Sequence, residues 1–311
     1  MNSDIRIGIA IVQWNHSKLT INLIEQLIGF KQKLEIVITD NGSQIMELEL
    51  LKNKLDQLNQ QAGNTLGVSV IENRYNSGFS VGTNLSVSKL LSKGCEWIWL
   101  LNNDVDVSGL KFNTLKDELS KLQPSIVGTR MREGDGRIFS GSYRFNRWLS
   151  TFSEIDSALN AREIKQRDRY ISGANMIVHH SIFQKIGMLN DRTFLYFEEL
   201  DFIRRANSSG YEQVLLDQVH VNHLGSASSK EDSFAQKRMY HQTWSTLDYY
   251  YRHEKLLFLP CLIFRTLARQ ITLMMSGRMN LVKAVFRATF EFLLGMNVDK
   301  QRPDVLGEHR Y

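Results

Sequence analysis

The sequence has few cysteines, no long uncharged apolar run and no basic leader, and each absence excludes a class of protein. Cys95 and Cys261 are its only two cysteines, each in an apolar context. They exclude a disulfide framework and a paired-thiol metal site, so a reducing cytoplasm is expected. No uncharged stretch of about 18 apolar residues is present, so no membrane-spanning helix is expected. Residues 1–7 lack a basic region followed by an apolar one, so no secretory signal is expected.

The length and composition are those of a globular protein. The 311 residues, 42% of them hydrophobic and 23% charged, are typical of one large α/β domain with an appended segment, or of two domains.

Acidic residues are absent from part of the tail. The net charge is +5, but six basic residues and no acidic residue lie between Lys255 and Phe290. This uneven distribution favours an anionic surface as a partner of the tail and not nucleic acid.

The N-terminal region predicts a β-α-β unit. Residues 5–12 are apolar and β-branched, residues 19–30 have apolar side chains at helical spacing, and residues 35–39 form a second apolar run that stops at Asp40. Ligands of such units are expected outside the carboxyl ends of the strands. The first β-α turn lacks the Gly-x-Gly-x-x-Gly sequence that brings a helix start against a pyrophosphate. This absence disfavours a nicotinamide-dependent dehydrogenase.

Two polar stretches follow predicted strands. A loop at 73–84 with two glycines follows a strand at 67–72 and runs into a helix at 85–92. Glycines permit close backbone approach and a helix start offers N–H donors, although an ordinary β-α connection is the alternative. The apolar strand at 96–101 ends in Asn102-Asn103-Asp104. Its carboxylate and carboxamide oxygens suit a hard divalent cation, whereas a turn or cap is the alternative.

The middle of the chain predicts a long connection. Residues 131–169 are polar, charged and rich in aromatics without a sustained period, which predicts a lid or a binding loop. A hairpin plus a surface helix at 156–166 is the alternative. Ser172-Gly173-Ala174 then leads into a strand that reaches Val178, and a further strand is predicted from Glu212 to Leu216. Residues 224–228 predict a flexible Gly/Ser loop.

Titratable residues are concentrated at Phe197-Glu198-Glu199-Leu200-Asp201. The three carboxylates lie between the apolar run 194–197 and the pair Arg204-Arg205, and His223 follows Asp201 by 22 residues. A helix is predicted from about Glu199 to Ser208. We expect this stretch to supply a catalytic base, and His223 to supply a metal ligand.

In combination, these motifs resemble an inverting glycosyltransferase of family 2 with the GT-A nucleotide-diphospho-sugar transferase fold, a Rossmann-like mixed sheet flanked by helices. Among its members the sequence is most similar to bacterial rhamnosyltransferase-like enzymes of polysaccharide assembly. The resemblance covers about residues 5–230. The motifs that carry it stand in family order: Asp40-Asn41-Gly42-Ser43, Asn76-Ser77-Gly78-Phe79 with Gly82 and Asn84, Leu101-Asn102-Asn103-Asp104, Ser172-Gly173-Ala174, Phe194 to Asp201, and His223 to Ser228.

The resemblance implies a role for each of these positions. Asn15 and Asp40 would contact the base and ribose of the nucleotide. The rest of the nucleotide-sugar site would be formed by Asn76, Gly78, Phe79, Gly82, Asn84, Asn103 and Gly173. Asp104 is similar to the last carboxylate of the family's Asp-x-Asp metal motif, and His223 resembles the histidine that joins the metal, which would be Mn²⁺ or Mg²⁺. The alternative for His223 is a hydrogen-bonded loop histidine without a ligand.

The sequence departs from the family pattern at two positions. The metal motif is Asn-Asn-Asp, so Asp104 is its only carboxylate and we expect the metal to bind only together with the nucleotide. The position of the catalytic base, usually Asp, is occupied by Glu199, as is familiar in the rhamnosyltransferase-like group. Asp201 is the alternative base, and Glu198 is expected to cap the helix or to support the site.

The tail predicts an amphipathic helix. Phe264, Leu267, Ile271 and Met274 recur at helical spacing with arginines between them, which fits a helix lying on an anionic membrane. A helical subdomain packed on the rest of the chain, or against a second protomer of a homo-oligomer, is the alternative. The predicted division is therefore a GT-A domain at 1–235 and a helical, basic segment at 236–311.

The expected function is transfer of a sugar to a lipid-linked glycan. The resemblance implies rhamnose from dTDP-rhamnose as the donor and a polyprenyl-diphosphate-linked acceptor, in O-antigen or capsule synthesis. The enzyme would lie in the cytoplasm, peripheral on the inner face of the cytoplasmic membrane. The alternatives are a UDP-hexose donor and a non-catalytic sugar-nucleotide-binding subunit. A nucleotidyltransferase is disfavoured, because the basic, glycine-rich phosphate loop of that class is absent.

Overall fold

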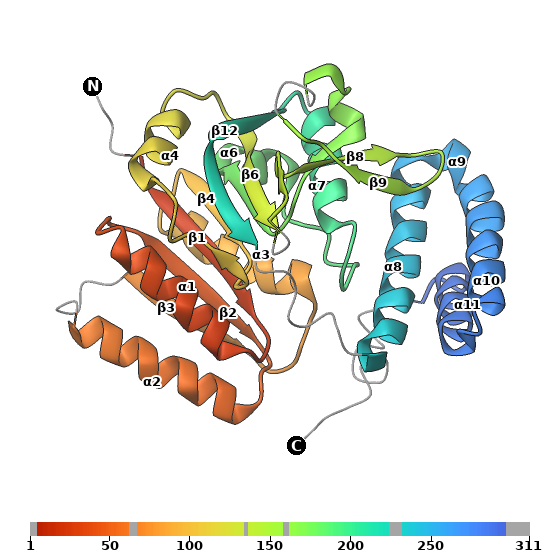
Figure 1. Cartoon of the computed structure of the whole chain (residues 1–311), viewed down its shortest axis with the longest axis horizontal. Coiled ribbons are helices and arrows are strands. Elements are labelled where there is room, and N and C mark those ends of the chain that lie inside the picture. The colour runs from red at the N-terminus through yellow and green to blue at the C-terminus, as the bar shows by residue number, and fades with distance from the viewer. Residues whose placement is uncertain (1–4, 62–66, 134–135, 158–161, 224–231, 297–311) are drawn as a thin grey trace.

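The protein, described here from a computed structural model, places helices on both faces of a mixed sheet and stacks its C-terminal helices at one end (Figure 1). The structure describes residues 5–61, 67–133, 136–157, 162–223 and 232–296. The predicted Gly/Ser loop at 224–228 lies outside these residues. The division predicted at residue 235 falls inside a helix, α8, which begins at Asp232.

Nine strands form the main sheet. Its order is β3-β2-β1-β4-β11-β6-β12-β5, and β7 pairs with β6. The strands β3, β2, β1 and β4 are parallel, and β11 runs antiparallel between β4 and β6. The strand bounds are β1 Ile7–Gln13, β2 Glu35–Asn41, β3 Gly67–Asn73, β4 Trp97–Leu101, β5 Val105–Asp106, β6 Ser125–Glu133, β7 Ile138–Phe139, β11 Asn175–His179 and β12 Glu212–His223.

Alternating side chains of these strands bury two separate cores. Ile7, Ile9 and Ile11 of β1 face one core, which is closed by α1 (Ser17–Gly29), α2 (Ile45–Gln61) and α4 (Phe112–Leu119). Ala10 faces the other core, under α3 (Phe79–Ser92), α6 (His180–Ile186) and α7 (Glu198–Ser208). The period of two along each strand thus produces a three-layer α/β/α arrangement.

The long connection predicted at 131–169 contains several short strands. β6 extends to Glu133, and β8 (Ser142–Asn146), β9 (Thr151–Glu154) and β10 (Arg169–Ile171) form a second sheet in the order β10-β8-β9. A short 3₁₀ helix, η1 (Gln166–Asp168), precedes β10. The hairpin of the alternative is therefore confirmed by the antiparallel pair β8 and β9, and Phe145 stacks on Phe152 across it with centroids 5.1 Å apart. The surface helix predicted with it at 156–166 is not continuous, since residues 156–157 and 164–165 are not helical and residues 158–161 lie outside the described residues.

Two predicted boundaries are wrong. Helix α3 begins at Phe79 and not at residue 85, because the Phe79 N–H is fixed by a hydrogen bond to the Phe194 carbonyl at 2.9 Å, a contact that sequence composition does not indicate. Strand β12 continues to His223 and not to Leu216, past an irregularity between Leu216 and His220 where its pairing with β6 shifts.

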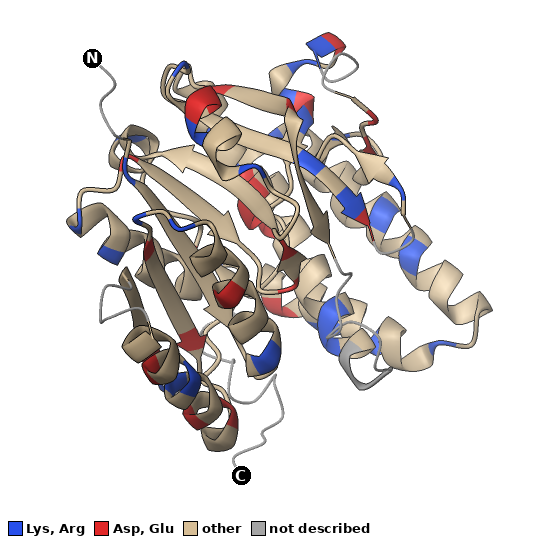
Figure 2. Ribbon diagram, turned by 60° about the vertical axis from the view of Figure 1, so that its left-hand side comes forward, with Lys and Arg blue, Asp and Glu red and all other residues tan. Residues whose placement is uncertain are grey.

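The C-terminal part is helical, as predicted. It consists of α8 (Asp232–His253), α9 (Lys255–Pro260), the π-helical turn η3 (Cys261–Arg265), α10 (Thr266–Met275) and α11 (Met279–Leu293). Tyr240 and Trp244 of α8 pack on Ala284 and Ala288 of α11. Figure 2 shows more Lys and Arg than Asp and Glu on these helices.

No membrane-spanning helix is expected from the sequence, yet one helical stretch of the described residues is long and apolar enough to cross a membrane. The helical stretch Lys255–Met275 satisfies both criteria, with a mean hydropathy of 1.5 over a window that is 22% buried. Arg265 and Arg269 interrupt this stretch, so it is apolar on average although the sequence contains no uncharged run of that length. Length and composition alone do not distinguish a span from a helix that lies on a surface.

Candidate functional site

Polar ends of several strands meet at one edge of the main sheet and line a cavity of about 480 Å³. The parallel strands β2, β1 and β4 have their carboxyl ends here, and antiparallel β11 begins here, since Asn175 pairs with Leu101. The cavity is lined by residues that follow β1 and β4, by the turn before β11, by the last residue of β12 and by the first turn of α7. Eight predicted site residues line it: Asn76, Gly78, Phe79, Asn103, Asp104, Gly173, Glu199 and His223.

Asp104 and His223 form a pair in this cavity. The Nε2 atom of His223 lies 3.5 Å from Oδ2 of Asp104, and both side chains are mostly buried. The pairing of His223 with Val105 across β12 and β5 brings them together, although they are far apart in the sequence. Oδ1 of Asp104 is buried and has no hydrogen-bond partner among the described residues. An unsatisfied carboxylate oxygen beside an imidazole nitrogen is a donor set that fits a divalent cation such as Mn²⁺.

Glu133 holds the other nitrogen of His223, a contact that the sequence analysis missed. Nδ1 of His223 lies 3.1 Å from Oε2 of Glu133, and the two residues are paired in the register of β12 and β6. Hydrogen bonds to Asp104 and Glu133 raise the pKa of His223 to about 9. A cation at Nε2 must therefore displace a proton, whereas Glu133 fixes the ring orientation, as carboxylates do for metal-binding histidines.

Glu198 and Glu199 begin α7 and both line the cavity. Each has a buried Oε2 atom without a hydrogen-bond partner among the described residues. Burial raises the pKa of Glu199, and burial together with the charge of Glu199 raises that of Glu198 well above its usual range. Gly173 lies directly against Glu199, because a Cβ atom at residue 173 would be 3.7 Å from Oε1. A carboxylate of raised pKa that faces open space is suited to accept a proton.

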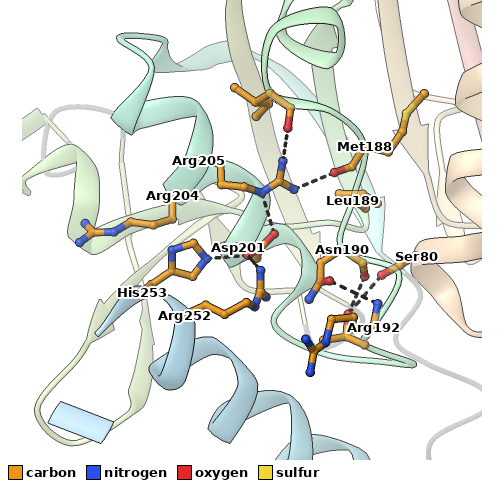
Figure 3. A network of polar contacts seen from close by, with 12 residues as sticks. Ser80, Met188, Leu189, Asn190, Arg192, Asp201, Arg204, Arg205, Arg252 and His253 are labelled. Carbon is orange, nitrogen blue, oxygen red and sulfur yellow. Dashed lines mark hydrogen bonds and ion pairs between the residues drawn. The ribbon is translucent and has the colours of Figure 1, made fainter. Parts of the chain in front are cut away.

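Asp201 does not line the cavity. It is fully buried on another face of α7, where Oδ2 accepts a hydrogen bond from Arg205 at 2.9 Å. Oδ1 lies 2.7 Å from Nη1 of Arg252 and 2.6 Å from Nε2 of His253. Figure 3 shows the three basic side chains converging on this carboxylate. Asp201 therefore ties α7 to α8.

The loop before α3 is held by an asparagine network. Asn41 at the end of β2 donates to Oδ1 of Asn76 and to the Gly78 carbonyl, both at 3.0 Å, and accepts from Asn73 at 3.1 Å. Gly78 has a φ of +90°, and a Cβ atom there would lie 2.5 Å from the Phe194 carbonyl oxygen. The close approach of residue 194 thus requires glycine at this position.

Four predicted nucleotide-site residues lie outside the cavity lining. Asn15 and Asp40 fix the turns beside it: Asn15 accepts from the Gln44 N–H at 2.9 Å, and the buried Asp40 accepts from Gln13 at 3.1 Å. Gly82 packs against Val12. Asn84 donates to the Leu189 carbonyl at 2.9 Å and accepts from its N–H at 3.0 Å.

The cavity also contains residues that the sequence analysis did not select. Trp14 and Asn41 lie beside predicted positions, so their place after β1 and in the Asp40-Asn41 motif was a usable signal. Lys237, Arg238 and His241 come from α8. No motif marks these three residues, because their placement depends on how α8 packs.

Three comparisons relate this site to known proteins. Residues 9–187 match the family model described as glycosyl transferase family 2. The chain is 24% identical over 220 residues to the low-salt glycan biosynthesis hexosyltransferase Agl10 of Haloferax volcanii, covering 69% of this chain and 66% of that protein. It is 20% identical over 167 residues to the N-acetylglucosaminyl-diphospho-decaprenol L-rhamnosyltransferase of Mycobacterium tuberculosis, covering 48% and 53%. The chain thus spans less than two thirds of the length of either relative.

A solved structure supports the fold assignment. The mannosyltransferase PcManGT from Pyrobaculum calidifontis, in complex with GDP-Man and Mn²⁺, superimposes with a TM-score of 0.55 at 8% identity. The likeness covers 97% of this chain and 79% of that one. At this identity it shows the fold alone, and the predicted GT-A fold with a helical C-terminal part is confirmed. Because the family model matches more than half of the residues, the chain belongs to glycosyl transferase family 2.

Proposed function

We propose that this protein transfers a sugar, with inversion, from a nucleotide donor to a lipid-linked glycan, and that the donor is dTDP-rhamnose. The observation that carries the proposal is the carboxylate of Glu199, which faces the cavity that Asp104 and His223 also line. The names of the two relatives, a hexosyltransferase of glycan biosynthesis and a rhamnosyltransferase of a diphospho-decaprenol acceptor, support the substrate classes. O-antigen or capsule synthesis would be the setting.

Glu199 would act as the general base. The acceptor hydroxyl gives its proton to the Glu199 carboxylate while its oxygen forms a bond to the anomeric carbon and the bond to the nucleoside diphosphate breaks. The pKa of Glu199, raised by burial, makes it a better proton acceptor once it is ionised. Asp201 is occupied by Arg205, Arg252 and His253, so Glu199 is favoured of the two predicted bases.

Asp104 and His223 would hold a divalent cation, which, when bound, neutralises the charge of the leaving diphosphate. Within the described parts of the chain, no group of three His, Cys, Asp or Glu residues forms a metal site. Two protein ligands leave the other coordination positions to phosphate oxygens and water. We therefore propose that the metal binds only together with the nucleotide.

A donor panel tests the function. Purified protein would be incubated with dTDP- and UDP-sugars, Mn²⁺ or Mg²⁺, and a prenyl-diphosphate-linked acceptor, and release of nucleoside diphosphate would be measured. We expect the fastest release with dTDP-rhamnose. A preference for a UDP-hexose would replace the donor assignment and keep the reaction class. Binding of donors without release under any of these conditions would instead support a non-catalytic subunit.

Glu133 provides a prediction about metal affinity. Glu133→Ala is expected to weaken Mn²⁺ binding in the presence of dTDP by about 10–100-fold, because the orientation of His223 is lost. Glu133→Gln should be less affected, since its amide oxygen still accepts from Nδ1. Electron paramagnetic resonance titration of free Mn²⁺ measures the affinity directly.

The exposed Glu163→Gln serves as the control for this titration. If Glu133→Ala lowered the melting temperature but left Mn²⁺ affinity at the wild-type value, Glu133 would be only a structural residue. If His223→Ala bound Mn²⁺ as tightly as wild type, the proposed metal site itself would be wrong.

We also propose that α9, α10 and α11 lie on the surface of an anionic membrane, on its cytoplasmic side. These helices and the turn η3 expose large apolar side chains, including Leu256 of α9 (95% exposed), Phe264 of η3 (72%) and Phe286 of α11 (63%). Phe264, Leu267, Ile271 and Met274, which predicted the amphipathic helix, are all exposed. Lys255 of α9, Lys283 of α11 and Arg278, which directly precedes α11, lie in the same segment. Exposed apolar groups among basic residues are typical of a helix at an anionic bilayer surface.

Substitutions on this face test the membrane proposal better than a deletion, because α11 packs on α8. Phe264→Glu and Phe286→Glu are each expected to reduce cosedimentation with phosphatidylglycerol vesicles about 10-fold, and phosphatidylcholine vesicles should bind less than phosphatidylglycerol ones. Met46→Glu, an exposed change on α2 far from these helices in Figure 1, is the control. Unchanged sedimentation together with a dimer in light scattering would assign the face to a second copy of the chain.

A further inference from the structure

The first half of α8 forms one wall of the cavity. Lys237, Arg238 and His241 line it, and their spacing places them within about 100° of one another around the helix. Lys237 and Arg238 are half-buried, and His241 is buried. The residues matched to the family end at residue 187, so this wall lies beyond them.

Helix α8 is fixed to the segment that leads into α7. The His241 ring stacks on Phe194 with centroids 4.4 Å apart, and Ser245 Oγ donates to the Leu195 carbonyl at 2.9 Å. Burial raises the pKa of Tyr196, and the positive charge of Arg238 opposes that rise. The basic wall and the first turn of α7 are therefore held in one connected unit.

The acidic groups of the cavity come from other elements. Asp104 follows β4, and Glu198 and Glu199 begin α7. The carboxylate of Glu291 on α11, which packs against α8, is engaged by the Tyr240 hydroxyl and by Nε of Arg287. The cavity thus combines an acidic side, suited to a cation and a proton, with a basic side. Ammonium and guanidinium groups bind phosphate oxygens through charge-assisted hydrogen bonds.

We propose that Lys237, Arg238 and His241 of α8 form a diphosphate-binding wall in this cavity. The inference rests on the proposed function, because that function brings two diphosphates to the site. One belongs to the nucleotide donor, whose diphosphate becomes more negative as its bond to the sugar breaks. The other belongs to the lipid-linked acceptor. Both present the same oxygen acceptors, and binding measurements separate them.

The test compares paired ligands on the full chain by isothermal titration calorimetry. The difference in affinity between dTDP and dTMP measures how strongly the donor diphosphate is bound. The difference between farnesyl diphosphate and farnesyl monophosphate measures the same for a prenyl diphosphate. Each ligand is titrated with Mg²⁺ and again with EDTA. The variants are Lys237→Met and Arg238→Met, and Lys185→Met on the exposed face of α6 is the matched control.

We expect each α8 variant to weaken binding of one diphosphate about 10-fold or more, to affect the matching monophosphate much less, and to keep the wild-type melting temperature. Loss with dTDP assigns the wall to the donor, and loss with farnesyl diphosphate assigns it to the acceptor. If wild type binds a diphosphate and the dissociation constants of both variants lie within about twofold of the wild-type value, the inference is overturned while the proposed function stands. If wild type binds neither diphosphate, both are overturned.

Discussion

Glu199→Gln is expected to lower the rate of sugar transfer by about 10²–10⁴-fold while nucleotide binding is retained. The amide has nearly the shape of the carboxylate but cannot accept the proton of the acceptor hydroxyl. Glu199 already faces the cavity with a buried oxygen, Oε2, that has no hydrogen-bond partner among the described residues, so the substitution removes no hydrogen bond from that atom. Transfer is measured as release of nucleoside diphosphate, and binding is measured by calorimetry with dTDP.

The length of the side chain provides the control. Glu199→Asp keeps the carboxylate but withdraws it by one methylene, and misplacement of this order costs about 10²-fold. It should therefore retain activity above that of Glu199→Gln. If Glu199→Gln kept more than about a tenth of the wild-type rate, Glu199 would not be the base.

The pH profile gives an independent check on the same residue. The base must be ionised to accept a proton, and burial raises the pKa of Glu199. The wild-type rate is therefore expected to fall as the pH decreases through this raised pKa, at a higher pH than for an exposed glutamate. Any rate left in Glu199→Gln should lack this acidic limb.

The layers of the fold could be predicted because local sequence patterns determine them. Alternating isoleucines in β1 and the apolar spacing of α1 are visible without any tertiary information. Asp104 and His223 were selected by motif, and the structure brings them within 3.5 Å through the pairing of β5 with β12. Whether they bind a metal stays a prediction.

Contacts that depend on register or on helix packing could not be predicted. Glu133 meets His223 only because those residues pair between β6 and β12, and nothing in either segment specifies that register. Lys237 and Arg238 appeared as part of a separate tail, since the docking of α8 on Phe194 is a tertiary contact. The different environments of Glu199 and Asp201, by contrast, could be predicted from their spacing in the helix. Side chains two positions apart in a helix, as Glu199 and Asp201 are, differ by about 200° around the helix axis, so these two carboxylates cannot share one face.

Asp201→Asn is expected to lower the free energy of unfolding by about 3 kcal/mol, at the lower end of the cost of breaking a buried ion pair. The lower end applies because Arg205 and Arg252 each keep a quarter of their side-chain surface exposed, so water partly solvates the two charges that lose their carboxylate partner. Chemical denaturation monitored by tryptophan fluorescence measures the change, and the exposed Asp56→Asn on α2 is the control.

The pH dependence of this difference follows from the environment of Asp201. Burial acts to raise its pKa, but the hydrogen bond from His253 and the charges of Arg205 and Arg252 lower the pKa overall. A carboxyl group whose pKa is lower in the folded protein stabilises it above the unfolded pKa of about 3.9, and this stabilisation is lost as the pH falls through the folded value. The gap in stability between wild type and Asp201→Asn should therefore be largest near neutral pH and should shrink in acid.

The same variant separates the two predicted bases. Because Asp201 joins α7 to α8 on a face of α7 that does not line the cavity, Asp201→Asn should keep a substantial transfer rate at temperatures where it remains folded. Its acidic pH limb should also match that of wild type, since Glu199 is unchanged. A folded Asp201→Asn protein that had lost transfer as completely as Glu199→Gln would show that Asp201 reaches the substrate, which its three basic partners in Figure 3 argue against.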